Sequence, residues 1–188
     1  MITVVSGLPR TGTSMMMQIL HKGGMDVLTD NLRKPDDNNQ KGYYELEKVK
    51  YLEKDNSWMH EAENKAVKII AQLLFFLPSQ YEYQIVFMER EIKEVMASQE
   101  KMLKNLGRED ALDVDADKLA NMFSQQIVKV KQWLSEQSNI RTLFVPFSGL
   151  FENPDEQMNR IGKFLNQDLD LEAMRNVIKP SLYRSRVS

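Results

Sequence analysis

Cysteine is absent from the 188-residue chain, and histidine occurs only at His21 and His60. The lack of cysteine excludes disulfides, thiolate metal sites and a cysteine nucleophile. The two histidines lie far apart in the sequence, which argues against a metal site built on imidazole ligands. We therefore expect a functional site that holds no metal ion.

Neither a strong charge nor a long hydrophobic run is present. Lys and Arg total 25 against 27 Asp and Glu, a net charge of −2 that gives no reason to expect nucleic acid as a partner. The most apolar stretch, residues 69–77, is interrupted by Gln72 and is far shorter than the roughly 20 residues of a membrane span. The N-terminus has no basic segment of the kind that opens a signal peptide. We expect a cytoplasmic protein without a membrane partner.

The alternation of apolar and amphipathic segments predicts a single α/β domain over residues 1–188. Short β-branched or apolar runs predict strands at residues 2–5, 25–28, 66–70, 84–88 and 141–146. Helical spacing and end signals predict helices at 13–22, 45–54, 92–103, 116–135, 153–165 and 171–178, with a short helix or turn at 73–77. The polar stretches 29–41 and 109–117 are predicted loops. The expected fold has three layers, with a mostly parallel central sheet flanked by helices.

The strongest motif is the segment Gly7-Leu8-Pro9-Arg10-Thr11-Gly12-Thr13-Ser14, which follows the first predicted strand and opens the first predicted helix. Backbone N–H groups and the helix dipole make such a turn a binding site for an anion. The glycine spacing is that of a Walker A loop, but Thr13 stands where a nucleotide kinase has its lysine, and the cation is Arg10. Only Glu89 could serve as the acid that holds magnesium in such kinases.

The segment Pro9–Ser14 resembles the 5′-phosphosulfate loop of sulfotransferases that use PAPS, 3′-phosphoadenosine 5′-phosphosulfate. The resemblance implies that Pro9, Arg10, Thr11, Gly12, Thr13 and Ser14 bind the phosphosulfate group. It also implies that Arg10 neutralises the bridging oxygen as its bond to sulfur breaks. The donor would be PAPS and the nucleotide product PAP.

Two further segments resemble the same family. Its members bind the 3′-phosphate with an Arg at the end of a strand and a Ser eight residues later, matched here by Arg90 and Ser98. The stretch 147–165 is similar to the late strand, turn and helix of the family, although Phe147 replaces the usual Tyr. The family often closes the nucleotide site with a late basic segment, and Arg184 would take that role.

The catalytic base is the least determined residue. The family histidine position holds Ile70, two residues after a matching lysine at Lys68. Glu45 ends a segment that resembles the Lys-Gly-Tyr/Phe-x-Glu stretch of many bacterial sulfotransferases, and it is the preferred base. Glu45 could instead be an acid that complements a helix dipole, and His60 is the second candidate base.

The resulting hypothesis is transfer of a sulfuryl group from PAPS to a hydroxyl or amine of a small-molecule or glycan acceptor, without a metal. Two alternatives stay open: a P-loop nucleotide kinase-like enzyme, and a protein that binds PAP or PAPS without catalysis. The short chain suggests an open site or a lid lent by a second subunit, as in a homodimer. A fold does not define an acceptor, so the acceptor stays unassigned.

Overall fold

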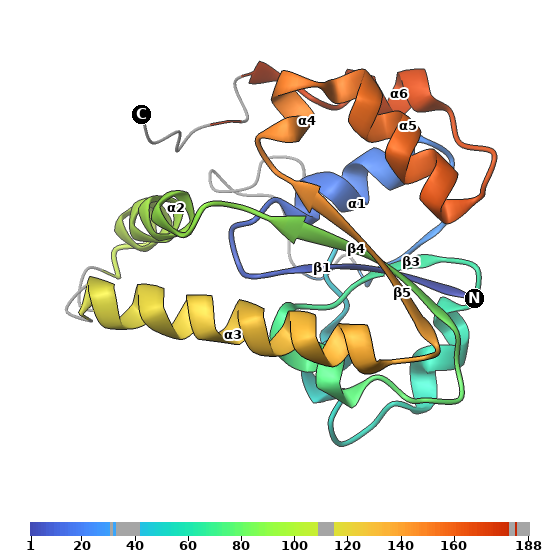
Figure 1. Cartoon of the computed structure of the whole chain (residues 1–188), viewed down its shortest axis with the longest axis horizontal. Coiled ribbons are helices and arrows are strands. Elements are labelled where there is room, and N and C mark those ends of the chain that lie inside the picture. The colour runs from blue at the N-terminus through green and yellow to red at the C-terminus, as the bar shows by residue number, and fades with distance from the viewer. Residues whose placement is uncertain (31, 33–41, 109–114, 181–182, 184–188) are drawn as a thin grey trace.

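A computed structural model describes residues 1–30, 32, 42–108, 115–180 and 183. Within them, five strands form one parallel sheet in the order β2-β3-β1-β4-β5 (Figure 1). The strands are β1 (Ile2–Gly7), β2 (Val27–Leu28), β3 (Ala66–Lys68), β4 (Tyr83–Glu89) and β5 (Ile140–Pro146). The predicted α/β fold with a mostly parallel sheet is confirmed.

The central position of β1 follows from its composition. All six residues of β1 are buried, and the strand pairs with β3 on one side and β4 on the other. A mostly apolar strand that is buried on both sides is stable only where both faces are covered, as in a parallel sheet. The N-terminal strand therefore lies in the middle of the fold.

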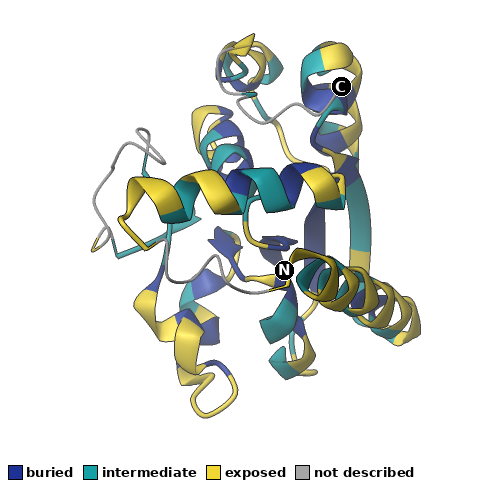
Figure 2. Cartoon of the chain, turned by 90° about the vertical axis from the view of Figure 1, so that its left-hand side faces the viewer, coloured by how far each residue is buried: buried dark blue, intermediate teal, exposed yellow. Residues whose placement is uncertain are grey.

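Helices cover both faces of the sheet (Figure 1). One face packs against α1 (Thr13–Lys22), α4 (Gly149–Glu152), α5 (Pro154–Leu165) and α6 (Leu171–Asn176). The other face packs against α3 (Ala116–Glu136) and three 3-10 helices, η1 (Glu47–Tyr51), η2 (Ser57–Ala62) and η3 (Ala71–Phe76). Figure 2 shows exposed residues alternating with buried and intermediate ones along the helices, as expected for amphipathic helices that cover a sheet. The three predicted layers are present.

The helix predicted over 45–54 is wrong in type and length. The structure has the 3-10 helix Glu47–Tyr51 there, preceded by an extended Leu46 and by Tyr44 at φ 50°. The buried residues Leu46, Val49 and Leu52 are spaced by three, which fits the 3.0 residues per turn of a 3-10 helix as well as an α-helix. The apolar spacing alone could not separate the two.

Two other elements were not predicted, η2 and the short helix α4, which are too short to show a periodic pattern. The predicted loop 29–41 lies largely outside the described residues, as does most of the predicted loop 109–117. In the part of the chain that the structure describes, no helix has the length and apolar character needed to cross a membrane.

Candidate active site

The loop between β1 and α1 depends on two glycines. Gly7 has φ 148° and Gly12 has φ 95°. A Cβ atom on Gly7 would lie 2.7 Å from the Met88 carbonyl oxygen, and one on Gly12 would lie 2.6 Å from the Phe147 ring. A larger side chain at either position would collide with its neighbours, so the loop keeps its shape only with glycine here.

The remaining loop residues shape the turn or face the solvent. The Thr11 side chain is buried, and its hydroxyl donates a 2.7 Å hydrogen bond to the Leu8 carbonyl. Pro9 is exposed. Gly12 precedes α1 without a side-chain cap, and the first turn of α1 carries no acidic residue. The first N–H groups of a helix lack intrahelical partners, so this end of α1 favours an anion.

The loop lies at the point where the chain changes direction across the sheet. The connection after β1 leads toward the β3 and β2 side, whereas the connection after β4 leads toward β5. In open parallel sheets the resulting crevice at the carboxyl ends of the strands is the usual ligand site. Arg10 follows β1, Arg90 and Ser98 follow β4, and Glu45 lies in the segment that follows β2.

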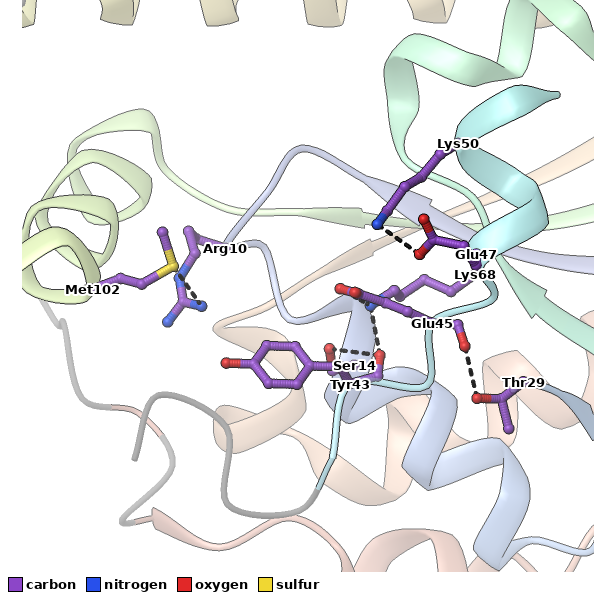
Figure 3. Close-up of polar contacts among 9 residues, drawn as sticks. All are labelled: Arg10, Ser14, Thr29, Tyr43, Glu45, Glu47, Lys50, Lys68 and Met102. Atoms are coloured by element: carbon purple, nitrogen blue, oxygen red, sulfur yellow. Dashed lines mark hydrogen bonds and ion pairs between the residues drawn. The ribbon is translucent and has the colours of Figure 1, made fainter. Parts of the chain in front are cut away.

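Arg10 lies in contact with the two predicted 3′-phosphate residues, Arg90 and Ser98, although each is 80 or more positions from Arg10 in the chain. The Arg10 Nε donates a hydrogen bond to the Ser98 hydroxyl at 3.1 Å, and Arg90 donates to the Arg10 carbonyl oxygen at 3.1 Å. Ser98 lies on α2 (Ile92–Asn105), and the Arg10 side chain points toward this helix (Figure 3). The Met102 sulfur on α2 lies 3.8 Å from an Nη atom of Arg10. The loop between β1 and α1 (residues 7–14, the predicted phosphate loop) and the predicted 3′-phosphate site are therefore contiguous.

Arg90 lies in a nearly closed environment, with only 7% of its side chain exposed. Its Nε is 2.8 Å from a carboxylate oxygen of Glu94, and its guanidinium lies 4.3 Å from the centre of the Phe147 ring. The Tyr183 ring is 5.6 Å from the same guanidinium. These four residues and Thr11 are among the residues that line a cavity of about 350 Å³ beside the loop.

A second polar cluster lies on the other side of the loop (Figure 3). The buried Lys68 ammonium is 2.5 Å from the Tyr43 carbonyl oxygen and 3.1 Å from a Glu45 carboxylate oxygen. The Ser14 hydroxyl donates to the same Tyr43 carbonyl at 3.3 Å. The carboxylate of Glu45, about one third exposed, is thus held next to the first turn of α1 by a lysine at the end of β3.

Neighbouring residues fix the segment that carries Glu45. The Thr29 hydroxyl donates to the Glu45 carbonyl at 2.8 Å, and the Glu47 N–H donates to the Asp30 carboxylate at 2.5 Å. Burial raises the pKa of the Tyr44 phenol, so Tyr44 stays protonated at neutral pH. Glu45 lies two residues before the 3-10 helix η1 and not within a helix.

One predicted residue, His60, stands apart from these clusters. His60 is exposed on η2, where its Nδ1 lies 2.6 Å from the Ser57 carbonyl oxygen. Arg184 lies outside the described residues. Sequence reasoning missed Glu94 and Tyr183 as site residues. Arg90 and Glu94 are four residues apart at the start of a predicted helix, which was a usable signal for an ion pair, whereas Tyr183 carries no pattern.

Known proteins resemble this chain in family and in fold. The family model described as Sulfotransferase domain matches residues 2–185. A solved structure described as the sulfotransferase domain from the Synechococcus PCC 7002 olefin synthase superposes with a TM-score of 0.55 at 16% identity, covering 95% of this chain and 77% of that chain. The sulfotransferase domain from the curacin biosynthetic pathway gives a TM-score of 0.53 at 14% identity, with the same coverages. No curated protein matches the sequence.

At these identities the solved structures establish the fold alone, whereas the family model spans nearly the whole chain. The fold and the loop define an α/β protein with a glycine turn at the carboxyl edge of a parallel sheet. The chain belongs to the sulfotransferase domain family. The resemblance stated from its sequence motifs is thereby confirmed.

Proposed function

We propose that this protein transfers the sulfuryl group of PAPS to a hydroxyl or amine of a small-molecule or glycan acceptor. The observation that carries the proposal is the contact between the phosphate loop and the predicted 3′-phosphate residues. Arg10 bonds Ser98, and Arg90 bonds the Arg10 carbonyl. One nucleotide with phosphates at both its 3′ and 5′ positions would engage both parts of this site.

The donor-binding roles follow from these positions. The loop residues Pro9 to Ser14 would surround the phosphosulfate, with the uncapped start of α1 supplying N–H donors. Arg90 and Ser98 would bind the 3′-phosphate beside the 350 Å³ cavity that Arg90 lines. The guanidinium of Arg10 would reach either part, since it already lies between the loop and α2.

In the transfer itself, the acceptor oxygen or nitrogen forms a bond to sulfur while the bond from sulfur to the bridging phosphate oxygen breaks. Glu45 would take the acceptor proton, and PAP would leave with the electron pair of the broken bond. Lys68 holds the Glu45 carboxylate and lies at the end of the strand beside β1. Its charge would also favour the negative oxygens of the sulfuryl group during transfer.

Calorimetric titration with PAP, with AMP and with ATP plus magnesium tests the donor assignment. We expect micromolar or tighter binding of PAP, with no measurable binding of AMP. Arg90→Lys and Ser98→Ala should each weaken PAP binding by about tenfold or more, because charge-assisted bonds to the 3′-phosphate are lost. Arg175→Ala removes an exposed arginine paired with Asp155 and serves as the matched control.

The two alternatives predict different results. A nucleotide kinase-like enzyme would bind ATP with magnesium and show no preference for PAP, which would overturn the proposal. A non-catalytic binding protein would bind PAP tightly and yield no sulfated product from PAPS with any hydroxyl or amine acceptor in a screen. Product formation that is lost in Glu45→Gln, with PAP affinity unchanged, would establish the transferase activity.

A further inference from the structure

Tyr183 joins the predicted 3′-phosphate site from the far end of the chain. Its hydroxyl donates a 2.9 Å hydrogen bond to one carboxylate oxygen of Glu94, and Arg90 donates to the other oxygen of the same carboxylate. The Tyr183 ring packs against Phe147 and Phe151, with ring centres 5.1 and 4.9 Å apart. The chain of contacts thus runs from Tyr183 through Glu94 to Arg90.

Burial makes this chain of contacts sensitive to each member. The side chains of Arg90 and Glu94 are each only 7% exposed. A buried carboxylate requires bonds to both its oxygens, since an unsatisfied one is strongly unfavourable. The Tyr183 hydroxyl supplies one of them, so its removal loosens the carboxylate that orients Arg90.

The orientation of Arg90 matters more here than its charge. Glu94 offsets the positive charge of Arg90, so the pair is neutral as a whole. A guanidinium in such a pair contributes to anion binding through the direction of its N–H donors. The Phe147 ring packs against one face of the Arg90 guanidinium. The hydrogen bonds to Glu94 and to the Arg10 carbonyl fix the direction of its N–H donors.

We propose that Tyr183 is a positioning residue for the nucleotide site, acting through Glu94 to hold the Arg90 guanidinium toward the 3′-phosphate. The inference rests on the proposed function, because it assumes that Arg90 binds this phosphate. It deepens that function by making Tyr183 part of the donor site. Tyr183 lines the same cavity as Arg90 and Glu94, so it forms a wall of the site and does not fill it.

A double-mutant cycle tests the inference by calorimetric titration with PAP on the full chain. Tyr183→Phe removes only the hydroxyl and keeps the ring packing, and Arg90→Lys keeps the charge but removes the fork of donors. We expect Tyr183→Phe to weaken PAP binding by about three- to tenfold, the effect of one lost hydrogen bond. In the Arg90→Lys background the same change should have no further effect, because the hydroxyl acts through Arg90.

The controls separate this role from a merely structural one. Tyr51→Phe alters a tyrosine that is 56% exposed and should leave PAP affinity unchanged. A structural role for the hydroxyl would lower the melting temperature of Tyr183→Phe while leaving PAP affinity, measured well below that temperature, as in the wild type. That result would overturn the inference.

The remaining outcomes are also decisive. If the wild type binds PAP and Arg90→Lys weakens it, but Tyr183→Phe does not, the inference fails and the proposed function stands. An equal loss from Tyr183→Phe in both backgrounds would mean that Tyr183 contacts the nucleotide itself, which also overturns the positioning role. If the wild type does not bind PAP, the proposed function fails and takes the inference with it.

Discussion

Replacing Gly12 by alanine would test the geometry on which the whole site depends. Gly12 has φ 95°, and its new Cβ would lie 2.6 Å from the Phe147 ring. A left-handed backbone costs an L-residue about 1–2 kcal/mol, and forcing extra atoms into a packed core costs about 1–3 kcal/mol more. The expected loss in the free energy of unfolding is therefore about 2–5 kcal/mol.

The chain contains a matched control for the backbone part of this effect. Gly24 has φ 98°, but no heavy atom outside its own neighbours lies within 4 Å of the position its Cβ would take. Gly24→Ala should therefore cost only the backbone term, about 1–2 kcal/mol. The difference between the two variants isolates the collision with Phe147.

Urea unfolding followed by tryptophan fluorescence measures both variants, because Trp58 is buried and reports on the core. The slope of unfolding free energy against urea should be unchanged, since the same surface is exposed. In a Phe147→Leu background, the cost of Gly12→Ala should fall toward that of Gly24→Ala. Equal costs for the two glycine variants in the wild-type background would refute the argument that Phe147 confines the loop.

Three further predictions concern the second cluster and α3. As the catalytic base, Glu45 should be needed for transfer, so Glu45→Gln should lower the rate of sulfuryl transfer by about 10²- to 10⁴-fold with little change in PAP affinity. The rate is measured by product formation, and a fall of less than tenfold would exclude Glu45 as the base. Lys68→Met should remove the 2.5 Å hydrogen bond to the Tyr43 carbonyl and the ion pair with Glu45. Both the transfer rate and the melting temperature should therefore fall. An unchanged rate would show that Lys68 serves the fold alone. Asp115→Ala should cost about 1 kcal/mol, or about 2–4 °C in melting temperature, because the carboxylate caps the first N–H groups of α3. Asp117→Ala is its control: Asp117 lies two residues further on, in the first turn of α3, and its replacement should change the melting temperature by less.

Much of the secondary structure was predictable because it depends on local patterns. The helix at 13–22 begins after the glycine turn and ends before Gly23, as its residues indicated. The strands that form the middle of the sheet stand out as short, mostly apolar and β-branched runs. The helix predicted at 45–54 failed because its apolar spacing of three fits two kinds of helix, and only the chain path around Tyr44 selects the 3-10 form.

The candidate site was predictable as far as its motifs are local. The loop at residues 7–14 is contiguous in sequence, and Arg90, just after β4, is only eight residues from Ser98 on the following helix α2. The contact of Arg10 with Ser98 could not be read from the chain, because it depends on β1 and β4 being neighbours in the sheet. The same holds for Lys68, whose partners Tyr43 and Glu45 belong to a different segment.

The sequence by itself determined which chemistry is available: a glycine turn ahead of a helix, the cations beside it, and no cysteine chemistry. These follow from residue types and short spacings, which chain connectivity preserves in any fold. Only the tertiary structure decided that Tyr183 reaches Glu94 and that Phe147 supports Arg90. Such contacts between distant segments arise from the order of strands and from burial, and neither is encoded in a local pattern.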